Sequence, residues 1–178
     1  MKQYDAIIIG FGKAGKTLAA ELSNRGWQVA VVEQSDEMYG GACPNVACIP
    51  TKTLIHESEI STLLYHNDFD KQSNMYRQAI ARKNKLTSFL RENNYEKLSK
   101  RPNVTIYTGK GSLVSANTVK VALPEEEIEL QGKEIFINTG STPIKSSAAS
   151  DVYKRQPYNN CIILFHNFLS LTIYTQLL

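Results

Sequence analysis

Cysteine is scarce in this chain, with three among 178 residues. Three cysteines are too few for the disulfide framework of a small secreted domain. The N-terminal stretch MKQYDAIIIG is typical of a strand rather than of an export signal. The sequence therefore predicts a cytoplasmic protein. In that compartment, two neighbouring cysteines favour redox or metal chemistry over a structural role.

Histidine and net charge are also sparse. His56 and His66 are the histidines nearest the cysteines, and we expect both to face solvent on a helix, so a zinc site is the less favoured reading. A net charge of +3 is too small to indicate a nucleic acid or an anionic membrane as partner. We expect the basic residues within 77–85 to form a solvated helix face. The length suits one domain, or one domain with an appendage.

Glycine spacing near the N-terminus gives the first functional motif. Residues 4–34 predict a strand, a tight turn, a helix and a second strand, with Gly10, Gly12 and Gly15 forming G-x-G-x-x-G. The first glycine allows the turn, the second lets a pyrophosphate approach the backbone, and the third lets helix and strand pack closely. Free N–H groups at the helix N-terminus favour phosphate. Glu33 ends the second strand and can accept hydrogen bonds from a ribose, which favours FAD or NAD over NADP. A glycine-rich turn in an ordinary α/β unit is the alternative.

The segment GGACPNVACIPTK carries the second motif. Cys43 and Cys48 lie five positions apart, which is about 7.5 Å along a regular helix. A disulfide needs Cα atoms within roughly 4.4–6.8 Å, so the start of the helix must be distorted. Pro44 favours an extended Cys43, and Pro50 should bend the helix. A cysteine at a helix N-terminus has a lowered pKa. The spacing predicts a disulfide that opens and closes; two reduced core cysteines are the alternative.

The remaining pattern indicates an α/β fold. Residues 75–100 have apolar residues at helical spacing. Residues 104–109, 110–117, 118–124 and 127–132 predict short strands of a small antiparallel meander, and 133–140 predict a buried strand. Together with the N-terminal unit, they predict a Rossmann-like domain with a parallel sheet and a small antiparallel β-meander.

The cysteine segment resembles the active-site segment of the pyridine nucleotide–disulfide oxidoreductases, whose pattern runs G-G-T-C and then G-C-x-P-[ST]-K. That family includes dihydrolipoamide dehydrogenase, glutathione reductase and mercuric reductase. The segments IIIGFGKAGKTLA, EQSDEMYGG, IPTKTL, RKNKLTSFLRENN and KEIFINTG look most like the family's bacterial flavoproteins linked to reactive-chlorine resistance. The match covers residues 1 to about 143. Ala42, Pro44 and Ala47 depart from the family pattern, and Ala47 would strain the disulfide if its position needs a positive φ.

The resemblance implies a role for each matching residue. Cys48 would lie against the flavin, Cys43 would exchange with the substrate, and Lys52 would stabilise the reduced flavin. The implied cofactor-binding residues are Gly10, Gly12, Gly15, Glu33, Gly41, Lys52, Gly111, Thr139 and Gly140. The cofactor would be FAD, with NAD(P)H as electron donor and a disulfide, metal ion or oxidant as small-molecule substrate. The full-length protein would be a homodimer.

The resemblance also implies an incomplete protein. Residues 1–145 would be the FAD-binding domain, and no second G-x-G-x-x-G marks an NAD(P)H domain. The interface domain is expected to be missing too, so we expect this polypeptide to be inactive by itself. An FAD-binding fragment without turnover is the second hypothesis. A monooxygenase-like flavoprotein with incidental cysteines is the third.

Residues 146–178 form a separate tail in the sequence. Residues 146–156, SSAASDVYKRQ, match the in-frame translation of a transposon-based sequencing adapter, and residues 157–178 hold no Asp, Glu, Lys or Arg. We expect a non-native tail in which Cys161 has no role and which has no fixed partner surface. A membrane span over 161–178 is the alternative, against which His166 and Asn167 count.

Overall fold

One β-sheet forms the body of the protein in the computed structural model, which describes residues 1–141, 163–165 and 172–173. Six of its strands lie in the order β3-β2-β1-β6-β5-β4. The strands are β1 (Lys2–Ile9), β2 (Val29–Glu33), β3 (Val104–Thr108), β4 (Lys110–Ser115), β5 (Thr118–Ala122) and β6 (Glu127–Ile137). The helices are α1 (Lys13–Asn24), the 3-10 turn η1 (Asp36–Met38), α2 (Ala42–Asn45), α3 (Cys48–Leu64) and α4 (Phe69–Ser99).

The centre of the sheet is parallel and buried on both faces. β1 lies between β2 and β6, with Ile8 opposite Val31 on one side and Phe136 on the other. Successive side chains of a strand point to opposite faces. Ile8 therefore joins the core cluster that includes α1, whereas Ile7 joins the cluster that includes β5. Because both faces are covered, the strands are apolar without interruption. The predicted Rossmann-like α/β fold is confirmed.

The strand assignment corrects the sequence expectation in two places. β3 was expected in the meander but pairs in parallel with β2, with Ile106 opposite Val31. Residues 127–132 and 133–140 were expected as two strands, but residues 127–137 form the single strand β6. β6 pairs with β5 through residues 127–131 and with β1 through residues 130–137. Gly132 does not break the strand. A Cβ there would come within 2.9 Å of Ile7, so glycine serves close packing.

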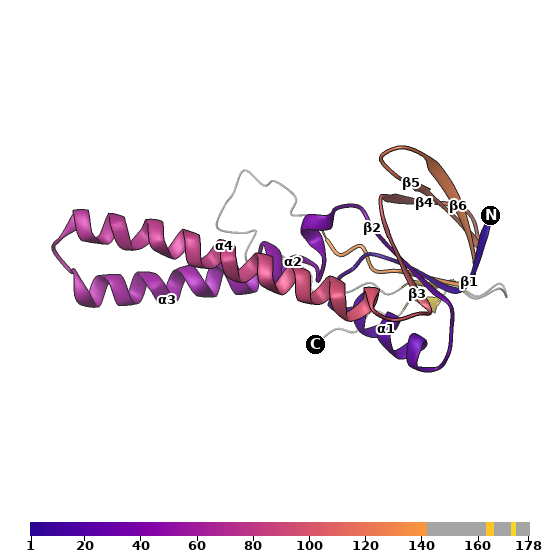
Figure 1. Ribbon diagram of the computed structural model, residues 1–178, viewed down its shortest axis with the longest axis horizontal. Coiled ribbons are helices and arrows are strands. Elements are labelled where there is room, and N and C mark those ends of the chain that lie inside the picture. The colour runs from indigo at the N-terminus through magenta and orange to yellow at the C-terminus, as the bar shows by residue number, and fades with distance from the viewer. Residues whose placement is uncertain (142–162, 166–171, 174–178) are drawn as a thin grey trace.

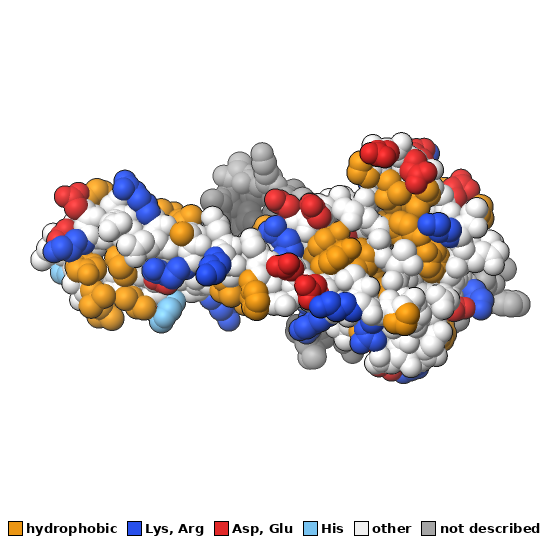
Figure 2. All heavy atoms as spheres, viewed as in Figure 1, with side chains coloured by type: hydrophobic (Ala, Val, Ile, Leu, Met, Phe, Trp, Pro, Cys, Tyr) orange, Lys and Arg blue, Asp and Glu red, His pale blue; other side chains and the backbone are white. Residues whose placement is uncertain are grey.

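Helices α3 and α4 form an antiparallel hairpin that projects away from the sheet (Figure 1). The predicted helix over 75–100 is confirmed, but α4 begins earlier, after Asp68 caps it by accepting the N–H of Lys71 at 3.1 Å. Arg82 of α4 donates to Glu57 of α3 at 2.8 Å. Hydrophobic side chains gather at the far end of the hairpin (Figure 2), where Leu63 and Phe69 are 85% and 80% exposed.

Two further strands follow, β7 (Ile163–Phe165) and β8 (Thr172–Ile173). β7 pairs antiparallel with β6, with Leu164 opposite Phe136. The expectation that the tail has no fixed partner surface is therefore wrong for residues 163–165. The segment 146–156 and Cys161 lie outside the described residues. Among the described residues, no helix combines the length and apolar character needed to cross a membrane.

Candidate cofactor and redox site

The glycine-rich turn joins β1 to α1 at the carboxyl end of the parallel strands. Gly10 has φ +107°, and its N–H donates to the carbonyl of Val32 at 2.7 Å. A Cβ on Gly10 would collide with the backbone carbonyl of Asn138, so only glycine fits this turn. Gly12 caps α1 without a side chain, and the first helical hydrogen bond runs from Lys16 N–H to Gly12 O at 3.0 Å. The earlier N–H groups of α1 are therefore available to an anion.

Glu33 lies where the sequence predicts it, at the end of β2. One carboxylate oxygen accepts the N–H of Phe11 at 2.9 Å, and the other accepts the N–H of Ser35 at 3.4 Å. The carboxylate is thus oriented by backbone groups from both sides. Each oxygen keeps a further lone pair, so the carboxylate can still accept a hydrogen bond from a ligand hydroxyl.

A cavity of about 420 Å³ gathers most of the predicted cofactor-binding residues. It extends from the end of β2 past the glycine-rich turn to the residues after β6. Seven predicted residues line it: Gly10, Gly12, Glu33, Gly41, Gly111, Thr139 and Gly140. Gly41 has φ +83°, and a Cβ there would lie 2.7 Å from the Cα of Gly12. The segment before Cys43 therefore lies directly on the glycine-rich turn.

Two predicted cofactor-binding residues do not line this cavity. Gly15 is buried beneath it, where a Cβ would lie 3.2 Å from the side chain of Ile8. Its position fits the close helix–strand packing expected of the third glycine. Lys52 is exposed on α3, one helical turn after Cys48, so the two side chains share a face of the helix.

Asn138 was not singled out in the sequence, although it lies at the centre of the site. Its N–H donates to Ile9 O at 2.7 Å, which extends the β1–β6 pairing by one residue. Its side-chain nitrogen lies beneath the glycine-rich turn, 3.6 Å from where a Cβ on Gly12 would be. Its place directly before the predicted site residues Thr139 and Gly140 was the sequence feature that could have identified it. The other lining residues that were missed include Gln34, Met38, Lys110 and Ser141.

The two predicted redox cysteines lie on different helices. α2 ends at Asn45 and α3 begins at Cys48, so the expected distortion of the helix is present. The expectation that Pro44 keeps Cys43 extended is wrong, because Cys43 is a helical residue of α2. Both thiols are free and exposed. Pro50 was expected to bend the helix, but it lies in the first turn of α3, where no backbone donor is needed. Ala47 has φ −119°, so the departure from glycine brings no positive-φ strain.

The two thiols interact with each other although Cys43 lies on α2 and Cys48 on α3. A hydrogen bond to Cys48 raises the pKa of the Cys43 thiol above its ordinary value, and the partial loss of water around this exposed thiol adds to the rise. The positive charge of Lys16 opposes that rise. The expectation that a cysteine at a helix N-terminus has a lowered pKa is therefore wrong for Cys43.

Lys16 is the α1 residue whose positive charge acts on the Cys43 thiol. Burial lowers its pKa, and the charges of Lys13 and Lys97 lower it further, whereas Cys43 raises it. Its ammonium donates to the side-chain oxygen of Asn94 on α4. The described residues hold no group of three or more His, Cys, Asp or Glu side chains that could bind a metal ion.

Comparison with known proteins assigns the family. The family model for pyridine nucleotide-disulphide oxidoreductases matches residues 4–167. The chain belongs to this family. The predicted family resemblance is therefore confirmed, and the flavoprotein relatives imply a flavin cofactor.

Three relatives show how the match is distributed. A protein of Escherichia coli (strain K12) described as a probable pyridine nucleotide-disulfide oxidoreductase, RclA, is 44% identical over 144 residues, which are 81% of this chain and 30% of that protein. A dihydrolipoyl dehydrogenase of Chlamydia trachomatis is 30% identical over 79% of this chain and 30% of its own length. A mercuric reductase of Lysinibacillus sphaericus is 32% identical over 79% of this chain and 26% of its own length.

A solved structure agrees with these matches. The Cu(II) complex of the HOCl-induced flavoprotein disulfide reductase RclA from Escherichia coli superposes with a TM-score of 0.73 at 43% identity. The match covers 83% of this chain and 31% of that chain. The present chain thus spans about a third of the length of the proteins it matches.

Proposed function

We propose that this chain is the FAD-binding and disulfide-bearing part of an oxidoreductase that passes electrons from NAD(P)H through flavin to the Cys43–Cys48 pair. The observation that carries the proposal is the contact of Gly41 with Gly12. It places the redox segment directly against the glycine-rich turn, so that one cavity runs from Glu33 to the segment before Cys43.

The cavity suits the adenosine diphosphate half of FAD. The turn at Gly10 and Gly12 leaves no Cβ over the start of α1, where free N–H groups and the helix dipole favour a pyrophosphate. Glu33 would accept the ribose hydroxyls, and its negative charge disfavours a 2′-phosphate at this place. Gly111 and Gly140, which both line the cavity, would border the adenine and the flavin-side parts respectively.

The cysteines would carry the electrons onward. A bound flavin supplies a two-electron reductant beside the disulfide. Reduction breaks the Sγ–Sγ bond and, with one proton taken up, leaves Cys48 as thiolate and Cys43 as thiol. The Cys43 thiol, once deprotonated, would attack an external disulfide and release one thiolate product. Cys48 would then attack the mixed disulfide, release the second thiolate and restore the Cys43–Cys48 bond.

The electron acceptor is a disulfide, a metal ion or an oxidant. The solved relative is described as a Cu(II) complex of an HOCl-induced flavoprotein disulfide reductase, and another relative is named a mercuric reductase, so the descriptions of the relatives support all three classes of acceptor. Because the chain spans about a third of its relatives, a fragment that binds FAD without turnover is the second candidate. The same site residues serve both.

Partial reduction of the FAD-loaded protein tests the assignment of the cysteines. A Cys48 thiolate against the flavin should give a long-wavelength charge-transfer band. Cys48→Ser should abolish this band, while Cys43→Ser should keep or enhance it because Cys48 then remains a free thiolate. If both variants give the same spectrum, the two roles are assigned wrongly.

A further inference from the structure

One face of α4 lies against the segment that carries Cys43. Arg91, Asn94 and Tyr95 are spaced i, i+3 and i+4, so they share this face. The Arg91 Nε donates to the side-chain oxygen of Asn45 at 3.0 Å, across 46 residues of sequence. Asn45 is the last residue of α2, two positions after Cys43. The guanidinium of Arg91 thus anchors the segment on the C-terminal side of Cys43.

Asn45 in turn hydrogen-bonds to residues that precede Cys43. Its side-chain nitrogen donates to Gly41 O at 2.8 Å and to Tyr39 O at 3.0 Å. Both donors and the oxygen of this amide are therefore engaged. Cys43 lies inside the loop that these hydrogen bonds close, between Gly41 and Asn45.

The other two residues of the α4 face fix the entry to the same loop. A Cβ on Gly40 would lie 2.8 Å from the Cγ of Asn94, so the backbone passes close to that amide. The rings of Tyr95 and Tyr39 stack with centroids 4.8 Å apart. The Tyr39 hydroxyl in turn hydrogen-bonds to Thr108 at 2.5 Å, which ties the loop to β3.

Cys48 is held differently. It is the first residue of α3, and only Val46 and Ala47 separate α3 from α2. The two sulfurs thus belong to two units whose relative placement depends on how firmly the Cys43 loop is anchored. A disulfide requires that placement to be narrow, with Cα atoms within roughly 4.4–6.8 Å.

We propose that Arg91 is a positioning residue for the redox pair, which acts through Asn45 to hold Cys43 where its sulfur can bond to Cys48. The inference rests on the proposed redox role of the two cysteines. It states that the anchoring by Arg91 stabilises the Cys43–Cys48 disulfide relative to the dithiol. When Arg91 is removed, the Cys43 loop samples more conformations, the effective concentration of one thiol at the other falls, and the disulfide becomes easier to reduce.

The test is the reduction potential of the pair in the full 178-residue chain. Cys161→Ser in every variant leaves only Cys43 and Cys48 to titrate. The protein is equilibrated in glutathione buffers of graded ratio, free thiols are trapped with an alkylating reagent, and the reduced fraction is read by mass. Arg91→Leu should lower the equilibrium constant for disulfide formation roughly tenfold, which is a potential about 30 mV less negative. Arg91→Lys keeps a donor and should recover part of the loss.

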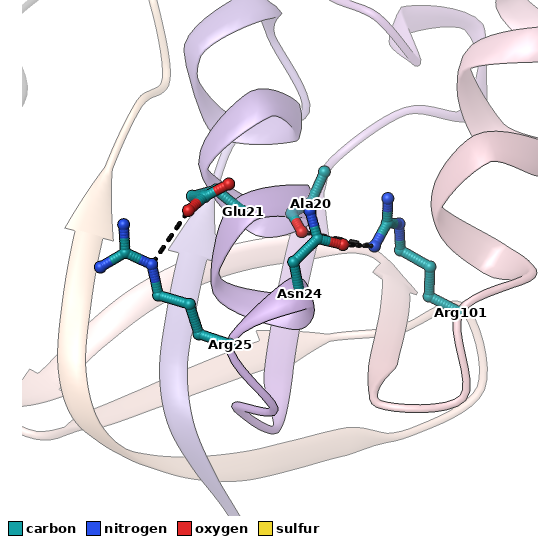
Figure 3. A network of polar contacts seen from close by, with 5 residues as sticks. All are labelled: Ala20, Glu21, Asn24, Arg25 and Arg101. Carbon is teal, nitrogen blue, oxygen red and sulfur yellow. Dashed lines mark hydrogen bonds and ion pairs between the residues drawn. The ribbon is translucent and has the colours of Figure 1, made fainter.

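Arg101 supplies the matched control. It follows α4 and donates to Ala20 O at 3.3 Å and to the side chain of Asn24 at 2.7 Å, so it anchors the chain to α1 rather than to the cysteine loop (Figure 3). Arg101→Leu should leave the potential unchanged. Asn45→Leu should shift it at least as far as Arg91→Leu does, because it also removes the hydrogen bonds to Gly41 O and Tyr39 O. The double variant should shift it no further than Asn45→Leu, because Arg91 acts through Asn45.

The outcomes separate the inference from the function on which it rests. Equal shifts in Arg91→Leu and Arg101→Leu, or no shift in Arg91→Leu, overturn the positioning role while the redox pair stands. Additive shifts in the double variant overturn the action through Asn45. If the unsubstituted chain forms no Cys43–Cys48 disulfide at any buffer ratio, both the inference and the proposed function fail.

Discussion

The carboxylate of Glu33 accepts the backbone N–H of Phe11 at 2.9 Å, which ties the end of β2 to the middle of the glycine-rich turn. One side chain thereby shapes the turn and faces the cavity that the turn borders. Substitutions at Glu33 therefore have to separate these two effects, and a change that removes the charge but keeps the acceptor does so.

Glu33→Gln should weaken FAD binding roughly tenfold, because the charge-assisted hydrogen bond to a ribose is lost. The amide oxygen can still accept from Phe11, and of the two backbone contacts only the longer one, from Ser35 at 3.4 Å, is lost. Titration of the chain with FAD, followed by quenching of flavin fluorescence, measures the change. Glu37→Gln is the matched control, since Glu37 is exposed and does not line the cavity. Equal affinities of the Glu33 variant and the unsubstituted chain would show that this fingerprint does not hold the ribose.

Gly41→Ala should destabilise the fold more than Gly26→Ala. Both glycines have φ +83°, which disfavours a Cβ at either position, and Gly41 also has ψ −170°, a combination essentially restricted to glycine. A Cβ on Gly41 would also press on Gly12, whereas nothing lies within 4 Å of one on Gly26. Overpacking adds about 1–3 kcal/mol at Gly41. Urea unfolding curves of the two variants give the difference, and identical midpoints would contradict the close contact of Gly41 with the turn.

The pKa of the Cys43 thiol should move in opposite directions in two variants. Cys48→Ala removes the hydrogen bond that raises this pKa and should lower it, while Lys16→Met removes the opposing positive charge and should raise it. Alkylation rate against pH, measured at Cys43 in a Cys161→Ser background, reports the thiolate fraction. Lys13→Met is the control for a general loss of charge, since Lys13 acts on Lys16 but is not among the groups that shift Cys43. If the alkylation rate of Cys43 depends on pH in the same way in Lys16→Met and in the unsubstituted protein, Lys16 does not influence the redox pair.

Residues 146–156 give a prediction about the gene. If the segment comes from a sequencing adapter, its nucleotides should equal the adapter's at every codon, although synonymous codons are free to vary in a gene. Amplification of the source locus with primers outside the segment, followed by sequencing, reads those codons. A locus that encodes the same residues with other codons would make the segment genuine.

The sequence predicted the parts of the site that depend on local pattern. The positions of Gly10, Gly12 and Glu33 follow from a strand, a turn and a helix of fixed spacing, and the break between Cys43 and Cys48 follows from the length of the segment. Arg91 could not be predicted this way, because its partner Asn45 lies 46 residues away along the chain. Asn138 was missed because its contact with Ile9 is also long-range, although its place beside Thr139 was a signal. The union of two expected strands in β6 was missed because Gly132 reads as a turn. It is instead the place where Ile7 packs against the strand.

The pairing of β1 with β6 also sets an order of events during synthesis. Gln3 and Gln131 meet across 128 residues, so the central pair of the sheet can close only after the whole helical hairpin has left the ribosome. The floor of the cavity is completed by Asn138 against Ile9, at the very end of that pairing. A nascent chain shorter than about 140 residues therefore carries the glycine-rich turn and both cysteines without a finished place for the cofactor. We therefore expect capture of a flavin to be a late step, with the thiols exposed to the cell's oxidants before it.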